Sequence, residues 1–180
     1  MRVAHRIGTA LIATVLVLAV FGLSVRIYMG REIEDRLAAG EAVNLAELRS
    51  PLPKPSFLAC PPHYCAADEA VASPVFDVPS DRLHQYWVEM ISSQQRIVNV
   101  TANQRAGRFV YIEHSALFRF PDIVTIEFVP LGPNRSSVAI FSRSRYGKYD
   151  FAKNRKRVER WLVLLQKSLA RPCHAEQRLM

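Results

Sequence analysis

The apolar run Ile7–Val25 constrains this chain of 180 residues more than any other feature. It holds nineteen residues without a charged side chain. At about 1.5 Å of rise per residue, a helix of that length approaches the hydrocarbon thickness of a bilayer. We therefore expect residues 1–30 to form an N-terminal transmembrane signal anchor, with the membrane contacted through Ile7–Val25.

The charges around the apolar run indicate on which side of a membrane the rest of the chain lies. Arg2 and Arg6 precede the run without any acid, whereas the residues after it carry both signs. Because the positive flank tends to stay in the cytoplasm, the sequence favours a single-pass protein of the bacterial inner membrane with its soluble domain on the periplasmic side. A cleaved signal peptide is the alternative, since Gly22 and Ser24 are small residues that suit a cleavage site.

Prolines mark the boundary between this segment and the folded domain. Pro51, Pro53 and Pro55 stand at every second position, which stops a helix and favours a stiff, extended spacer. We expect a stalk and linker over residues 31–56, an exported globular domain over 57–170 and a tail over 171–180. A domain of roughly 115 residues is large enough for one independent core.

Helical periodicity appears at both ends of the expected domain. Behind Ser80, which suits an N-terminal cap, the apolar residues of Leu83–Ile91 recur with the spacing of one helix face. A last helix is expected over residues 151–169, with Phe151 and Trp161 on its apolar stripe. These two helices can cover a sheet.

Between the helices the apolar period changes to 2. Four strands rich in Val, Ile, Phe and Tyr are expected, at Arg96–Ala102, Arg108–Ser115, Asp122–Pro130 and Ser137–Arg145. Their short connections leave no room for a crossover helix, so successive strands are antiparallel. The chain is therefore predicted to be α+β: an N-terminal transmembrane helix followed by an α-β-β-β-β-α domain, with a four-stranded antiparallel sheet covered by two helices on one face.

Two cysteines open the expected domain in the sequence Cys60-Pro-Pro-His-Tyr-Cys65. In an oxidising compartment such a pair closes a small loop, so we favour a disulfide between Cys60 and Cys65. Metal binding through Cys60, His63 and Cys65 is the alternative, but it supplies only three ligands. We therefore expect no metal and no cofactor, and a free thiol at Cys173.

Charge is divided unevenly along the chain. From residue 31 to 133 nine Lys and Arg stand against thirteen acids, a net of −4, whereas from 134 to 180 twelve stand against three, a net of +9. On the last helix, opposite its apolar stripe, lie Lys153, Lys156, Arg157 and Arg160. This basic face is expected to contact an envelope protein partner, an anionic lipid or a small anionic ligand; the alternative is an exposed helix whose charges only keep it solvated. Nucleic acid is not expected as a partner, because no binding motif is present and an exported domain rarely meets it.

A second group of charges surrounds the end of the expected fourth strand. Arg143 and Arg145 alternate onto one strand face. Asp122 starts the neighbouring strand, Arg119 comes just before it, and Asp150 follows beyond the turn. The group is interpreted either as an ion-pair network that fixes the last helix against the sheet or as an anion pocket. In the pocket, arginine forks would bind a carboxylate or phosphate group.

Catalysis has little support in the sequence. His114, Ser115 and Asp122 are the residue types of a hydrolytic triad, but adjacent strand residues point to opposite faces and a Gly-x-Ser-x-Gly elbow is missing. We assign no catalytic residue and expect a non-catalytic binding or accessory module. The alternative is an envelope hydrolase or transferase that acts on a phosphorylated or lipid substrate near Arg143, Arg145 and Asp122.

Four segments of the chain together resemble an uncharacterised family. They are Phe57-Leu-Ala-Cys-Pro-Pro-His-Tyr-Cys65, Ser73-Pro-Val-Phe-Asp77, Phe120-Pro-Asp122 and Ser142-Arg-Ser-Arg-Tyr-Gly147, the last followed by Asp150, Asn154 and Arg155. On these segments the chain is similar to the family called domain of unknown function 1499 (DUF1499), over roughly Phe57–Leu165. The family carries no established catalytic residues, so the resemblance implies domain limits and no mechanism.

Overall fold

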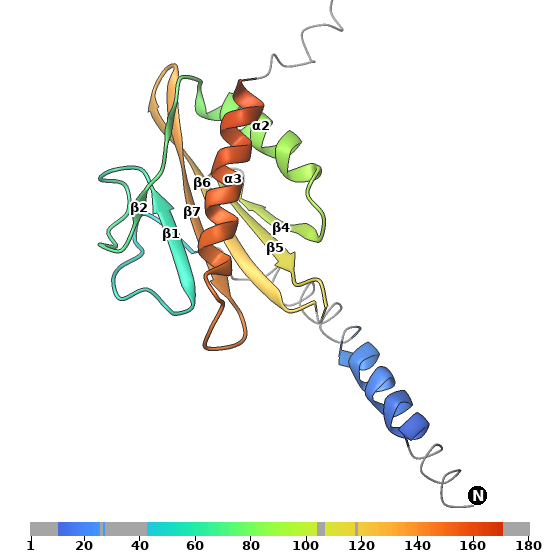
Figure 1. Ribbon diagram of the computed structural model, residues 1–180. Helices are drawn as coiled ribbons and strands as arrows, with labels where there is room; N and C mark the ends of the chain where they lie inside the picture. The colour runs from blue at the N-terminus through green and yellow to red at the C-terminus, as the bar shows by residue number, and fades with distance from the viewer. Residues whose placement is uncertain (1–10, 26, 28–42, 104–106, 118, 171–180) are drawn as a thin grey trace, which may run out of the picture.

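The computed structural model describes residues 11–25, 27, 43–103, 107–117 and 119–170. Helices α2 and α3 lie on one face of a seven-stranded mixed sheet (Figure 1). The strands are β1 Ser56–Cys60, β2 Val71–Ala72, β3 Val75–Phe76, β4 Ile97–Asn103, β5 Arg108–His114, β6 Pro121–Gly132 and β7 Arg135–Ser144. The helices on the sheet are α2 Ser80–Ser92 and α3 Lys153–Leu169, and a further helix covers residues 11–25.

The prediction of a four-stranded antiparallel sheet was wrong. Strands β4 to β7 lie close to the predicted positions and pair antiparallel, but the sheet continues in the order β2-β1-β7-β6-β5-β4, with β3 also on β7. β1 pairs antiparallel with β7 and β2 pairs parallel with β1, which makes the sheet mixed. The three added strands are five, two and two residues long. Such short strands do not establish a period in the sequence.

Each of the two covering helices buries one stripe, and the stripes meet over the sheet. Trp87 of α2 and Trp161 of α3 are both fully buried and pack edge to face, with ring centroids 5.6 Å apart. The sheet contributes Tyr111, whose ring lies 6.1 Å from that of Trp87. Two helices on one face were predicted, and the aromatic rings at their contact form the centre of the core.

Helix α3 begins later than predicted. Phe151 and Ala152 have φ values of 52° and 60°, which is the left-handed region and cannot continue a right-handed helix. The helix therefore begins at Lys153, and Phe151 is 82% exposed. Its predicted place on the apolar stripe was wrong, because the backbone reverses its handedness just before the helix and carries the ring outward.

The opposite face of the sheet is covered by residues 43–52, which lie in the stretch predicted to be a linker. Leu45 and Leu52 are buried there with side chains of the sheet that include Leu58, Val129 and Phe141. A cluster of apolar side chains on both faces makes β6 and β7 the central strands of the core.

A buried carboxylate fixes this covering segment. Glu127 of β6 is 3% exposed and accepts hydrogen bonds from the Leu45 amide at 3.2 Å, the Tyr64 hydroxyl at 2.8 Å and Arg108 Nε at 2.6 Å. Burial, together with the bond to Glu127, raises the pKa of Tyr64 to about 12. Three separate parts of the chain therefore meet at one carboxylate.

The predicted disulfide between Cys60 and Cys65 is confirmed. It closes a loop in which His63 adopts a positive φ of 65° and from which Tyr64 reaches Glu127. Because both sulfurs are bonded to one another, they are not the thiolate ligands of the metal alternative. Cys173 lies outside the described residues.

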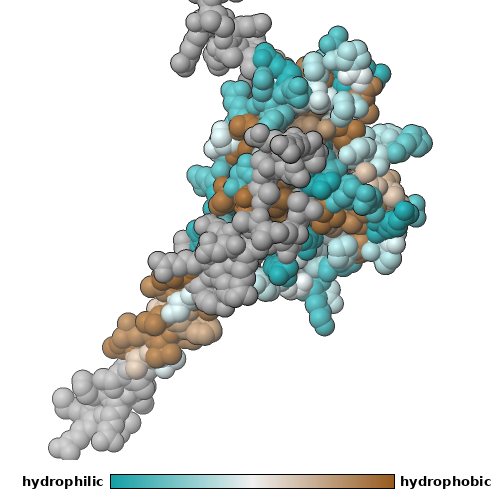
Figure 2. Space-filling view, turned by 180° about the vertical axis from the view of Figure 1, so that it is seen from behind, coloured by the Kyte–Doolittle hydropathy of each residue, from teal (hydrophilic) through white to brown (hydrophobic). Residues whose placement is uncertain are grey.

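The prediction of a transmembrane helix was wrong. Among the residues that the structure describes, none of the helices combines the length and the apolar character that a membrane crossing needs. The helix over residues 11–25 is about 22 Å long at 1.5 Å per residue, against roughly 30 Å of hydrocarbon; residues 7–10 of the predicted segment lie outside the described part. Nine of its large apolar side chains, between Leu11 and Leu23, are 58–67% exposed, and Figure 2 shows a largely apolar surface on this segment.

We expect the domain to lose stability as the pH falls through the range in which His84 titrates. The imidazole stacks on Phe109 with centroids 4.3 Å apart, and burial lowers its pKa, against a smaller opposing effect of Asp81. A lowered folded-state pKa means that the unfolded chain binds the proton more readily. The free energy of unfolding is therefore fully present above the unfolded pKa of about 6.5 and falls as the pH drops from there through the folded pKa.

Urea unfolding of wild type and His84→Phe between pH 5 and 8 checks this expectation. The phenylalanine keeps the stacking and removes the titration, so the stability of the variant should depend less on pH than that of the wild type. His63→Gln, at an exposed position, is the matched control and should keep the wild-type dependence. Parallel pH curves for wild type and His84→Phe would show that another group is responsible.

Candidate functional site

A row of polar side chains lies on the helix-covered face of the sheet, at one end of three neighbouring strands. In the strand register, Glu113 of β5 is opposite Asp122 of β6, and Asp122 is opposite Ser144 of β7. Ser142, two residues before Ser144, shares the same face because strand side chains alternate. The strands therefore present two carboxylates and two hydroxyls to helix α3.

Arg157 of α3 joins this row. Its guanidinium donates to Glu113 through Nε and to Asp122 through Nη2, and Nη1 donates to Ser142 Oγ and Asn154 Oδ1, both at 2.8 Å. Only 7% of the Arg157 side chain is exposed. A planar guanidinium with donors along two edges suits this arrangement, because it can bond several acceptors at once. We call Glu113, Asp122, Ser142, Asn154 and Arg157 the polar network.

Asn154 carries the polar network to the start of the helix. It is fully buried; its Oδ1 also accepts from Ser142, and its Nδ2 donates to Asp150 Oδ2 at 2.7 Å and Ser144 Oγ at 3.1 Å. A longer bond of 3.3 Å reaches the carbonyl of Pro55, just before β1. The amide of Asn154 therefore connects α3 with β7 and with the chain entering β1.

Asp150 caps the first turn of α3. Its carboxylate oxygens accept from the amides of Ala152 and Asn154, each at 3.0 Å, in addition to Asn154 Nδ2. Burial alone would raise the pKa of Asp150, but the hydrogen bonds from Asn154 and Ala152 outweigh it, so the pKa lies below its ordinary value. The carboxylate is therefore ionised at neutral pH, with its charge directed at the helix start.

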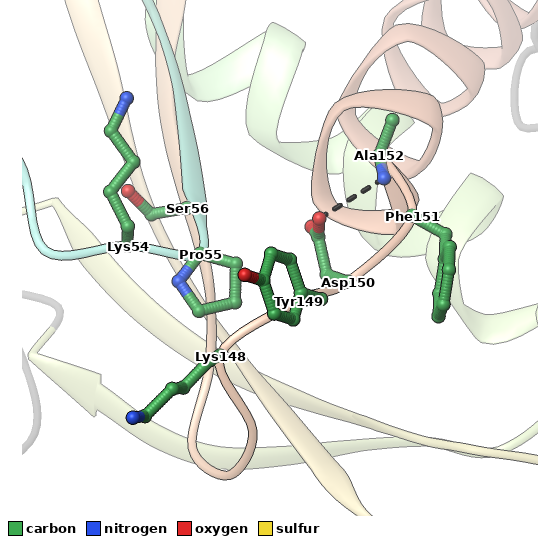
Figure 3. A pocket seen from close by; sticks show the side chains of 8 residues that line it. All are labelled: Lys54, Pro55, Ser56, Lys148, Tyr149, Asp150, Phe151 and Ala152. Atoms are coloured by element: carbon green, nitrogen blue, oxygen red, sulfur yellow. Dashed lines mark hydrogen bonds between the residues drawn. The ribbon is translucent and has the colours of Figure 1, made fainter.

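An open pocket of about 530 Å³ adjoins this capped helix start. Its lining comes from the chain around the start of β1 and from the loop between β7 and α3: Lys54, Pro55, Ser56, Lys148, Tyr149, Asp150, Phe151 and Ala152. Figure 3 shows the side chains of Lys54 and Lys148 extending outward and the bond from Ala152 to Asp150 on the helix side. The buried Ser56 hydroxyl has no hydrogen-bond partner among the described residues. We call this hollow the β1–α3 pocket.

The pocket combines positive charge with hydrogen-bond donors. Two lysines belong to its lining, and its one carboxylate, Asp150, already accepts three bonds from the protein. A group bearing several acceptor oxygens and a negative charge, such as a phosphate or carboxylate, matches this lining.

Among the predicted site residues, Arg157 lies on the side of α3 opposite to its predicted position. It is 6% exposed and faces the sheet, so its place on a solvated basic face was wrong. The spacing Asn154, Arg157, Val158, Trp161 is the i, i+3, i+4, i+7 pattern of one buried stripe. That pattern was visible in the sequence, but Lys and Arg were assigned to the solvent side because they are rarely buried without partners.

Lys153, Lys156 and Arg160 do lie on the outside of α3. Lys153 and Lys156 are exposed, and Arg160, whose side chain is 51% exposed, also donates to Glu113 at 3.3 Å. The outer face of the helix is therefore basic, but without Arg157.

Arg143 of β7 and Asp122 of β6 lie on opposite faces of the sheet. Arg143 is opposite Ile123, whereas Asp122 is opposite Ser144, so these two side chains do not line one pocket. Arg145 follows the end of β7. Arg143 is half-buried on the face away from the helices; burial, followed by the nearby Arg145 cation, lowers its pKa. Arg119 lies in the β5–β6 turn with a positive φ of 55°. Of these residues, only Asp122 belongs to the polar network.

Sequence reasoning missed Lys54, Ser56 and Lys148. They lie far apart in sequence and meet only because β1 pairs with β7 in the register Ser56 to Arg143. Since β1 itself was not predicted, no signal in the sequence placed the chain before β1 beside the loop after β7. Asn154 did carry a signal, because it belongs to the segments that resemble the family.

The comparisons with known proteins agree with these segments. The model of the family described as protein of unknown function (DUF1499) matches residues 53–165, a range that runs from just before β1 into α3 and includes the polar network. No curated protein is similar enough to this chain to count as a match. The chain belongs to the DUF1499 family.

Proposed function

We propose that this protein is an exported, membrane-attached binding module that takes an anionic group into the β1–α3 pocket. One observation carries the proposal: Lys54 and Lys148, from separate parts of the chain, both line a hollow whose only carboxylate is already engaged by backbone and amide donors. An ammonium group binds a phosphate or carboxylate as a point charge with three donors. No nucleophile is required of such a site.

The polar network supports this proposal by fixing both walls of the pocket. Asn154 donates to the carbonyl of Pro55 on one wall and to Asp150 on the other, and Ser144 donates its amide to the same Pro55 carbonyl at 3.1 Å. A preformed site loses less entropy when it binds. The network therefore has a positioning role in this proposal and does not touch the ligand.

Two features favour a location outside the cytosol and near a membrane. The Cys60–Cys65 disulfide is typical of oxidising compartments such as the periplasm. The apolar side chains of residues 11–25 are largely exposed, and in this proposal lipid covers them. The outer cations of α3, Lys153, Lys156 and Arg160, then offer a contact for an envelope protein partner.

Glycerol phosphate is the probe that tests the pocket. Calorimetric titration of the full chain in neutral detergent should give saturable binding for glycerol phosphate and none for glycerol. The double variant Lys54→Gln and Lys148→Gln should weaken the affinity at least tenfold, because a charge-assisted hydrogen bond contributes about 1.5–3 kcal/mol and tenfold corresponds to about 1.4 kcal/mol.

The matched control removes the same charge outside the pocket. Lys156→Gln with Lys167→Gln changes two exposed cations of α3 and should alter the affinity less than twofold, since screening over about 8 Å at physiological salt limits their reach. Equal weakening by both double variants would reduce the effect to net charge and refute the pocket. Absence of saturable binding in the wild type would refute it as well.

A further inference from the structure

Two loops lie side by side at the end of the sheet where β6 begins and β7 ends. Residues 115–120 connect β5 to β6, and residues 145–152 connect β7 to α3. The rings of Phe120 and Tyr146 lie 6.4 Å apart, and the Arg145 amide donates to the Pro121 carbonyl at 3.3 Å. The two loops are therefore neighbours in space.

Large apolar and aromatic side chains extend from both loops into solvent. Their exposed fractions are 69% for Leu117, 40% for Phe120, 49% for Tyr146, 84% for Tyr149 and 82% for Phe151. We call these five residues the loop rim. Tyr149 and Phe151 are the most exposed aromatic side chains among the described residues, and an exposed cluster of this kind marks an interaction surface more often than an isolated exposed residue does.

The backbone holds the loop rim in place. Gly147 has a φ of 93° and Phe151 a φ of 52°, and Asp150 between them is bonded to the first turn of α3. The positive φ at Phe151 is what keeps its ring off the apolar stripe of the helix. Tyr149 and Phe151 are thus presented by a loop that is hydrogen-bonded to the first turn of α3.

Most of the charges in the two loops are positive. Residues 115–120 and 145–152 contain Arg119, Arg145, Lys148 and one carboxylate, Asp150. Asp150 accepts a hydrogen bond from Asn154, and Asp122 in β6 accepts one from Arg157. A partner of this surface therefore has to be apolar where the rings lie and negative around them.

We propose that the loop rim docks on the surface of a bilayer that contains anionic phospholipid. Tyr and Phe beside Lys and Arg are the side chains that settle at a membrane–water interface, with rings among the upper acyl chains and cations at the headgroups. The rings stand on separate loops, which suits a fluid lipid surface. A helical peptide would instead need an apolar groove.

This proposal rests on the proposed function in one respect: a lipid phosphate is the anionic group that enters the β1–α3 pocket. Tyr149 and Phe151 belong both to the pocket lining and to the loop rim. Rings inserted beside the pocket would bring its two lysines to the depth of the phosphates.

Fluorescence of a single exposed tryptophan tests the docking in the full chain. Trp87 and Trp161 are fully buried, so they give a background that contact quenchers do not reach. Phe151→Trp adds an indole on the loop rim, and Leu131→Trp adds one at a 43%-exposed position near the end of β6, at the other end of the sheet. The proteins are reconstituted with vesicles of phosphatidylcholine and phosphatidylglycerol that carry bromine on their acyl chains.

The added indole in Phe151→Trp should be quenched by the brominated lipid and protected from acrylamide. The added indole in Leu131→Trp should be accessible to acrylamide and should not be quenched by the lipid. Adding Arg145→Gln and Lys148→Gln to Phe151→Trp should lower the ratio of docked to undocked domain by about fivefold for each cation lost. Omitting phosphatidylglycerol from the vesicles should also lower this ratio. Equal acrylamide access for both indoles in anionic vesicles would overturn the proposal, and would favour a protein partner for the loop rim.

The two proposals fail separately. Loss of glycerol phosphate binding with a lipid-quenched indole at position 151 would remove the pocket and keep the docking surface. A solvent-exposed indole at position 151 in a chain that still binds glycerol phosphate would refute the docking surface and leave the pocket proposal intact.

Discussion

Replacing Arg157 with methionine is expected to lower the free energy of unfolding by about 3–5 kcal/mol, the range measured when one partner of a buried ion pair is removed. The side chains of Glu113 and Asp122 are only 13% and 15% exposed, so the variant leaves two carboxylates poorly solvated and without their main partner. Methionine is similar in length and apolar, which isolates the loss of charge from the loss of volume. Urea unfolding at pH 7 measures the difference.

Two further variants separate the network from the charge of the helix. Arg155→Met removes an exposed cation of the same helix, paired with Glu159 at i+4, and should cost less than about 0.5 kcal/mol. Combining Arg157→Met with Glu113→Gln and Asp122→Asn should recover much of the loss, because the stranded charges are gone. If Arg157→Met costs no more than Arg155→Met, the polar network does not stabilise the fold.

Trp161→Ala is expected to cost about 3–5 kcal/mol as well, because it empties the centre of the core. The side chain is fully buried and packs edge to face on Trp87. The surrounding α2, α3 and sheet are held by other contacts, so the cavity can close only in part. Thermal and urea unfolding give the size of the loss.

Trp161→Phe tests which property of the ring matters. The indole N–H of Trp161 is buried without a hydrogen-bond partner among the described residues, so the phenyl ring loses volume but also removes an unsatisfied donor. It should cost clearly less than the alanine variant. Val163→Ala, at a 48%-exposed position of α3, should change the stability by less than about 0.5 kcal/mol. If Trp161→Ala costs no more than Val163→Ala, the packing described for the core is contradicted.

The long elements of the domain were predictable because their periods are. Strand β6 alternates over many residues and α2 repeats an apolar spacing over three turns, so both lie close to their predicted bounds. The short strands β2 and β3 have two residues each, and their existence depends on partners that are distant in sequence. A periodic sequence pattern indicates only local order. The sequence therefore predicted strands β4 to β7 and not the edge formed by β1 and β2.

The candidate site was predictable only in part, for two different physical reasons. Arg157 was assigned to solvent by residue type, although its spacing from Trp161 placed it on the buried stripe; partners on three strands make that burial tolerable. Lys54 and Lys148 carry no local signal at all. They share a pocket because β1 adds to β7.

The bond between Glu127 and the Leu45 amide bears on how a shorter version of this protein should be cut. A fragment trimmed to the family match would begin at residue 53 and so discard Leu45 and Leu52, uncovering the back of β6 and β7. Such a fragment would expose the apolar side chains on this face of the sheet and self-associate. A fragment that begins before residue 43 keeps the covering segment.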